Sequence, residues 1–140
     1  MPADDCVFCK IVAGKIPCFK VYEDERTLAF MDINPATRGH ALAIPKEHFP
    51  DLFETPDELL AAAAATARKV AGAIQNTLGP DGVNLVQANG PGAAQSVFHL
   101  HLHVLPRYAG DNLMLNWGMT PGDMDEIKAV AEQISRAIEA

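Results

Sequence analysis

Three histidines at alternate positions, His99, His101 and His103, constrain this chain more than any other feature of its sequence. Only five histidines occur in 140 residues, so accident is a poor explanation for the triplet. Successive side chains of a β-strand point to opposite faces, and the three histidines would therefore share one face. The other face would carry apolar residues that meet a hydrophobic core: Phe98, Leu100, Leu102 and Val104.

The spacing of these histidines separates two kinds of chemistry. A strand rises about 3.3 Å per residue, which puts His99 and His103 roughly 13 Å apart at the backbone. That is too far for both to join His101 around one metal ion, whose bonds to imidazole are about 2 Å long. Two neighbouring histidines could still share a catalytic metal, and three histidines on an ordinary polar face are the non-functional alternative. A central imidazole between two flanking donors favours a nucleophile, because the neutral ring is available near pH 7.

The rest of the sequence predicts an α+β domain. Strands are expected over residues 20–23, 27–33, 41–45, 82–88 and 98–105, separated by turn-forming residues. A capping box at Thr55-Pro56-Asp57-Glu58 predicts a helix that ends at Gly79. A second helix is expected over about 121–138 and should pack by its apolar stripe. Because the strands come in runs, we predict a five-stranded antiparallel sheet with two main helices, in one domain spanning residues 1–140.

Charge and composition exclude several functions. The net charge of −7 argues against a general nucleic-acid binder, which needs a basic surface. No apolar run is long enough to span a membrane, and acids stand at Asp4 and Asp5, where a signal peptide would be basic. We therefore expect a cytoplasmic protein with neither nucleic acid nor membrane as its partner. The three cysteines do not suggest a disulfide framework, and Cys6-Val7-Phe8-Cys9 has the spacing of a metal knuckle.

A glycine-rich segment, Asn89-Gly90-Pro91-Gly92-Ala93-Ala94-Gln95-Ser96, leads into the histidine segment. Such a loop can turn backbone N–H groups toward a phosphate, and the Ser96 hydroxyl can add a donor. A hairpin turn without any ligand would have the same sequence. The neighbouring histidines favour the phosphate site.

The segment Gln95-Ser96-Val97-Phe98-His99-Leu100-His101-Leu102-His103-Val104-Leu105-Pro106-Arg107 resembles the signature of the histidine triad (HIT) family. The resemblance continues upstream and covers residues 6 to about 107. It includes Cys6-Val7-Phe8-Cys9-Lys10-Ile11, Ala29-Phe30-Met31-Asp32-Ile33-Asn34-Pro35 and Gly39-His40-Ala41-Leu42-Ala43-Ile44-Pro45-Lys46-Glu47-His48, which look like the bacterial branch of that family.

The resemblance implies a HIT-like α+β fold, in which the sheet extends across a homodimer. It implies a hydrolase or transferase that acts on the alpha-phosphate of purine nucleotides, dinucleoside polyphosphates or nucleoside phosphoramidates, through a covalent nucleotidyl-histidine. His101 would be the nucleophile, and His99, His103 and Ser96 would assist it. The residues that would bind the nucleotide are Phe8, Ile11, Phe30, Asp32, Ile33, Asn89, Gln95, Ser96 and Val97.

Family similarity also implies a structural zinc ion bound by Cys6, Cys9, His48 and His99, with no cofactor needed for the chemical step. Two thiolates and two neutral imidazoles form a complete tetrahedral set. The alternative is that the cysteines are free buried thiols and His48 only caps a loop. No functional role is predicted for Cys18 or His40.

Two departures from the family pattern bear on the substrate. Many relatives have asparagine at the position of Ala88 and glycine at the position of Ala94, so a ribose or backbone contact is lost or moves to Asn89. Pro106-Arg107 is closer to the dinucleoside polyphosphate branches. A zinc-binding nucleotide sensor without significant catalysis is the alternative function.

Overall fold

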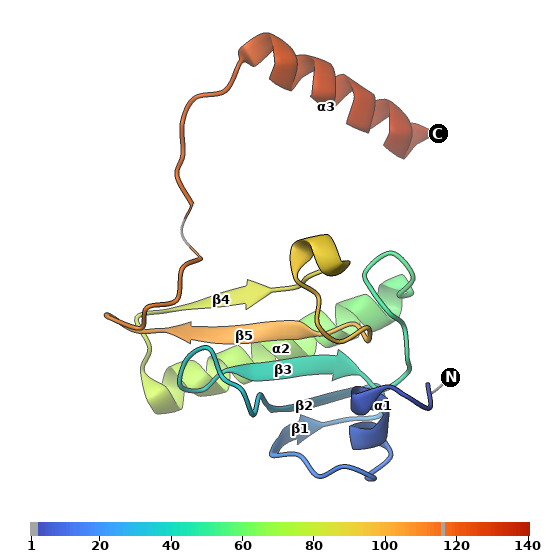
Figure 1. The fold of residues 1–140 in the computed structure, drawn as a ribbon, viewed down its shortest axis with the longest axis vertical. Coiled ribbons are helices and arrows are strands. Elements are labelled where there is room, and N and C mark those ends of the chain that lie inside the picture. Colours follow the sequence, from blue (N-terminus) through green and yellow to red (C-terminus); the bar gives the residue numbers. More distant parts are fainter. Residues whose placement is uncertain (1–2, 116) are drawn as a thin grey trace.

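One antiparallel sheet organises the protein, whose computed structural model describes residues 3–115 and 117–140 (Figure 1). The five strands are β1 (Lys20–Glu23), β2 (Thr27–Met31), β3 (Ala41–Pro45), β4 (Gly82–Val86) and β5 (Leu102–Arg107), in the order β1-β2-β3-β5-β4. Every neighbouring pair is antiparallel. The predicted fold class and strand count are therefore confirmed.

The long helix α2 (Asp57–Leu78) covers one face of the sheet (Figure 1). Its buried side includes Ala63, Ala67, Val70 and Ile74, which pack against the small residues of β2 and β3. The alanines let the helix approach the sheet closely. As expected, the helix ends at Gly79, whose φ of +58° is the left-handed conformation that favours glycine.

The prediction of a capping box at the start of α2 is wrong. Pro56 is the N-cap residue, and no side chain caps the helix. The Thr55 hydroxyl instead donates to the carbonyl oxygen of Asp51 at 2.6 Å, so the preceding turn uses the group that would have capped the helix.

A short helix that the sequence did not predict, α1 (Val7–Val12), packs on the opposite face of the sheet. Cys6 is its N-cap, and the Cys6 Sγ accepts a hydrogen bond from the Cys9 N–H at 3.3 Å. Phe8 and Cys9 are buried against Leu28, Phe30 and other residues of β2 and β3. The sheet is thus covered on both faces, and α1 lies on the face that carries the histidines.

The histidine segment enters the sheet later than predicted. β5 begins at Leu102, so His99 and His101 lie in the loop that precedes it. The Leu100 N–H donates to the Phe49 carbonyl at 2.8 Å, which pairs this part of the backbone with another loop instead of a strand. Leu100 is fully buried as expected, but Phe98 is half-exposed and does not face the core.

The C-terminal helix α3 (Met124–Glu139) stands apart from the sheet at the end of an extended arm (Figure 1). Its N-cap is Asp123, whose carboxylate accepts from the Asp125 and Glu126 N–H groups. Its apolar stripe does not pack against the rest of this chain, because none of its side chains is buried. Among the described residues, no helix is long and apolar enough to cross a membrane.

Hydrogen bonds tie the start of this arm to the sheet where it leaves β5. The Arg107 guanidinium donates to both carboxylate oxygens of Asp111, to the Leu113 carbonyl and to the Asn84 side chain, at 2.7–3.2 Å. A charged group with four acceptors is strongly held. These hydrogen bonds hold Asp111 and Leu113 beside the end of β5. Further along the arm, Leu115, Trp117 and Met119 border a pocket together with β4.

Candidate functional site

A cavity of about 510 Å³ lies between α1 and the histidine-bearing face of the sheet. This volume is in the range that holds a small organic ligand. Nine of the residues implied by the family resemblance line it: Phe8, Ile11, Phe30, Asp32, Ile33, Ser96, Val97, His101 and His103. The walls are mostly apolar, and three of the polar residues on them, Asp32, His40 and His103, lie close together.

His101 is held with one ring nitrogen committed and the other available. Its Nδ1 lies 2.7 Å from the His99 carbonyl oxygen. A carbonyl can only accept, so Nδ1 carries the hydrogen and the lone pair of the neutral ring is on Nε2. The edge of the Phe8 ring packs against the imidazole, with ring centroids 5.1 Å apart. Burial lowers the pKa of His101, which keeps the ring neutral and suited to nucleophilic attack.

His103 lies beside His101, with ring centroids 4.9 Å apart. Burial, followed by the neighbouring His101 and His40, lowers the pKa of His103 to about 4. The ring is therefore neutral at pH 7, and in this form it can donate or accept hydrogen bonds but carries no charge.

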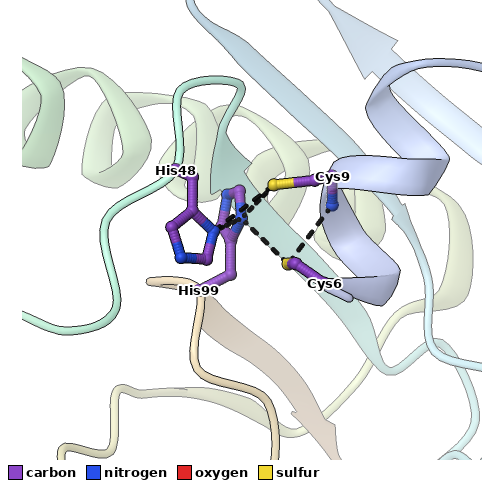
Figure 2. Close-up of side chains that lie close together, drawn as sticks. All are labelled: Cys6, Cys9, His48 and His99. Carbon is purple, nitrogen blue, oxygen red and sulfur yellow. Dashed lines mark hydrogen bonds between the residues drawn. The ribbon is translucent and has the colours of Figure 1, made fainter. Parts of the chain in front are cut away.

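His99 belongs to a different cluster, formed with Cys6, Cys9 and His48. Figure 2 shows the two cysteines at the start of α1 facing the two imidazoles. His99 Nδ1 lies 3.5 Å from Cys6 Sγ and 3.6 Å from Cys9 Sγ, and His48 Nδ1 lies 3.3 Å from Cys9 Sγ and 3.2 Å from His99 Nδ1. The ring of His99 is oriented by its Nε2, which donates to the Pro45 carbonyl at 2.7 Å.

These distances fit a tetrahedral zinc site. Bonds of about 2.0 Å to nitrogen and 2.3 Å to sulfur imply separations between ligand atoms of about 3.3–3.8 Å. The four donor atoms all lie within 4.8 Å of one another, and three of the four residues are buried. Burial raises the pKa of the Cys6 thiol, and a bound cation would reverse that effect by stabilising the thiolate. The donor set therefore suits zinc.

Asp32, His40 and His103 form a second compact group of donors. Its shortest contact, 2.9 Å between His40 Nε2 and His103 Nδ1, is a normal hydrogen-bond length. This group is therefore accounted for by hydrogen bonding between its own members.

Three of the residues expected to act in catalysis or nucleotide binding do not line the cavity. His99 belongs to the cysteine cluster. The Gln95 side chain is buried and braces the loop, accepting from the Gly90 N–H and donating to the Pro50 and Val97 carbonyls. The Asn89 side chain accepts from the Leu52 N–H and exchanges hydrogen bonds with Gln87.

The loop before the histidines contains a short 3₁₀ helix, Pro91–Ala93, followed by Ala94 with φ of +64°. This left-handed conformation costs an L-residue energy that glycine avoids. Glycine at this position would adopt the same conformation without that cost.

No functional role was predicted for His40, which lines the cavity beside His103 although 63 residues separate them in the sequence. The two meet because β3 pairs with β5, with Leu42 opposite His103. The only signal in the sequence was the scarcity of histidine, since the other four had already been assigned roles.

Comparison with known proteins gives consistent matches. The HIT domain family model matches residues 13–110. "Protein hit" of Bacillus subtilis is 42% identical over 139 residues, which cover 97% of this chain and 96% of that protein. Adenosine 5'-monophosphoramidase hnt1 of Schizosaccharomyces pombe is 44% identical over 134 residues, which cover 95% of this chain and 98% of that protein.

Solved structures agree with the sequence matches. A HIT family protein from Bacillus anthracis superposes with a TM-score of 0.90 at 41% identity, covering 96% of this chain and 98% of that one. A Zn-bound histidine triad family protein from Mycobacterium smegmatis superposes with a TM-score of 0.75 at 43% identity, covering 95% and 97% of the two chains.

Proposed function

Because the chain belongs to the HIT domain family, we propose that it is a nucleotide hydrolase or transferase that acts on the alpha-phosphate of purine nucleotides through a covalent bond to His101. The observation that carries this proposal is the hydrogen bond between His101 Nδ1 and the His99 carbonyl. It leaves the Nε2 lone pair free on a ring that lines the cavity.

The chemistry proceeds in two displacements. His101 Nε2 attacks the alpha-phosphorus, and the bond to the leaving group breaks with its electron pair going to that group. An amine leaving group takes a proton from water, whereas a phosphate leaves as an anion. Water then attacks the phosphorus, loses a proton to solvent and restores His101. His103 and Ser96, which line the same cavity, donate hydrogen bonds to the phosphate oxygens.

The rest of the cavity suits a nucleoside. Phe8 and Phe30 meet edge to face, with centroids 5.5 Å apart, and together with Ile11, Ile33 and Val97 they offer an apolar pocket for a purine base. The Asp32 carboxylate lies at the same cavity and would accept hydrogen bonds from the ribose hydroxyls. The S. pombe relative, named as an adenosine 5'-monophosphoramidase, supports a P–N substrate, while dinucleoside polyphosphates remain the other substrate class.

Cys6, Cys9, His48 and His99 would hold a structural zinc ion in this protein. The ion would join the N-terminal segment and α1 to the loops before α2 and β5, while the chemistry stays with His101 and His103. The M. smegmatis relative is a Zn-bound protein, which supports the assignment. Thiolate ligands also suit the reducing cytoplasm, where we place the protein.

A homodimer is part of the same proposal. β4 is the last strand of the sheet order and carries the half-exposed Leu85, and α3 carries an uncovered apolar stripe. A second copy of the chain could pair with the free edge of β4 and bury α3 of its partner, which would remove both exposed surfaces from water.

Turnover assays test the proposed function. The wild type and the His101→Ala variant would be assayed on adenosine phosphoramidate and on a diadenosine polyphosphate, with and without a chelator. Cys18→Ser is the matched control, because Cys18 lines the cavity without a chemical role. The wild type and Cys18→Ser should turn over at least one substrate, whereas His101→Ala should bind AMP without turnover. A wild type that binds nucleotide but hydrolyses neither substrate would be a sensor and not an enzyme.

A further inference from the structure

His40 lines the cavity together with His101 and His103 and is 5% exposed. It lies immediately before β3, where Gly39 has a φ of +90°. This left-handed φ favours glycine, and a Cβ there would also lie 2.7 Å from the Leu78 side chain and 3.1 Å from the Pro106 ring. The His40 N–H donates to the Thr37 carbonyl at 3.1 Å. The backbone around His40 is therefore tightly determined.

The hydrogen bonds of His40 fix its tautomer. The Ala36 backbone N–H donates to His40 Nδ1 at 3.0 Å. A backbone N–H can only donate, so Nδ1 must be the acceptor and the neutral ring carries its hydrogen on Nε2. Burial lowers the pKa of His40, which favours this neutral form.

His40 in turn fixes the tautomer of His103. His40 Nε2 lies 2.9 Å from His103 Nδ1 and 3.5 Å from the Asp32 carboxylate. Because His40 Nε2 carries a hydrogen, it donates to His103 Nδ1, and the neutral His103 then carries its own hydrogen on Nε2. The other tautomer of His103 would place two N–H groups against each other at this short distance.

We propose that His40 is a positioning residue that holds His103 as the Nε2–H tautomer, so that His103 presents a hydrogen-bond donor to the phosphate. This inference rests on the proposed function. The two neighbouring imidazoles then have opposite tautomers, set by different partners. The His99 carbonyl leaves a lone pair on the outer nitrogen of His101, and His40 leaves a hydrogen on the outer nitrogen of His103. One ring attacks the phosphorus while the other stabilises the charge that develops on its oxygens.

Nitrogen-15 NMR of the wild type tests the tautomer without any substitution. The nitrogen shifts of a neutral histidine distinguish a protonated ring nitrogen from an unprotonated one. At pH 7 in the absence of nucleotide, His103 should show a protonated Nε2 and an unprotonated Nδ1. A protonated Nδ1 would overturn the proposal whether or not the protein proves to be a hydrolase, which separates this test from that of the proposed function.

Two variants of equal size test the consequence for catalysis. His40→Gln can place an amide N–H donor where Nε2 now lies, whereas His40→Glu places a carboxylate acceptor there. Both variants lose the same hydrogen bond from the Ala36 N–H, so a difference in kcat between them isolates the effect of the donor to His103. The Gln variant should keep the wild-type tautomer of His103, and the Glu variant should invert it. We expect the Glu variant to have a kcat about 10²-fold below that of the Gln variant, the usual loss for one transition-state donor. Equal kcat values, or an unchanged tautomer in the Glu variant, would contradict the proposal.

Discussion

Replacing Ile127 and Ile134 of α3 together by serine should weaken self-association of the chain by about 10³-fold. The two side chains are 52% and 56% exposed, so about half of each remains available for burial by a partner. Full burial of an isoleucine is worth about 1.5–3 kcal/mol, which leaves about 1 kcal/mol at each site. A symmetric dimer contains four such sites and loses about 4 kcal/mol, and each 1.4 kcal/mol is a tenfold change.

Sedimentation equilibrium over a range of protein concentrations measures this dissociation constant. The matched control is the double substitution Glu132→Ser and Arg136→Ser, which lies on the opposite side of the same helix and leaves its net charge unchanged. The control should associate like the wild type. Equal dissociation constants for the two double variants, or a wild type that stays monomeric at every concentration, would refute the role assigned to α3.

Three further predictions concern the metal site, pH and the loop. Elemental analysis should find one zinc ion per chain in the wild type and less than one in Cys9→Ser. When free zinc is 10²–10³-fold above its dissociation constant, the bound ion should add about 3–4 kcal/mol to the free energy of unfolding. Equal zinc contents would exclude this site. Burial, together with His101 and His40, lowers the pKa of His103 from 6.5 to about 4. Between these two pH values the unfolded chain binds more protons than the folded chain, so the free energy of unfolding should fall as the pH drops through this range. In urea titrations at several pH values His103→Asn should show a shallower fall, and an identical slope would count against this coupling. Ala94→Gly should raise the free energy of unfolding by about 0.5–1 kcal/mol, because glycine relieves the left-handed backbone, and a decrease would show that the residue is not strained.

The sheet could be predicted because its signals are local. Alternating apolar residues and turn-forming residues identified all five strands. The sharing of one face by His101 and His103 follows from the geometry of an extended chain and is confirmed by their ring contact. α1 has only six residues, which is too short for a helical period to stand out in the sequence.

The predictions failed where a polar group forms a hydrogen bond with a group outside the expected helix or strand. The Thr55 hydroxyl binds the Asp51 carbonyl instead of capping α2, and the Leu100 N–H binds the Phe49 carbonyl instead of a neighbouring strand. Neither partner can be identified from periodicity. The contact between His40 and His103 depends in the same way on the pairing of β3 with β5, which only the folded chain defines.

Intact-protein mass spectrometry during a single turnover tests most directly whether His101 becomes covalently bound to the nucleotide. Protein in excess over a phosphoramidate or polyphosphate substrate would be quenched in base, because a phosphoimidazole is labile in acid, and then fragmented to locate the modified residue. We predict a transient nucleotidyl adduct on His101 in the wild type and no adduct in His101→Ala. An adduct on another residue, or continued turnover by His101→Ala without an adduct, would contradict the account.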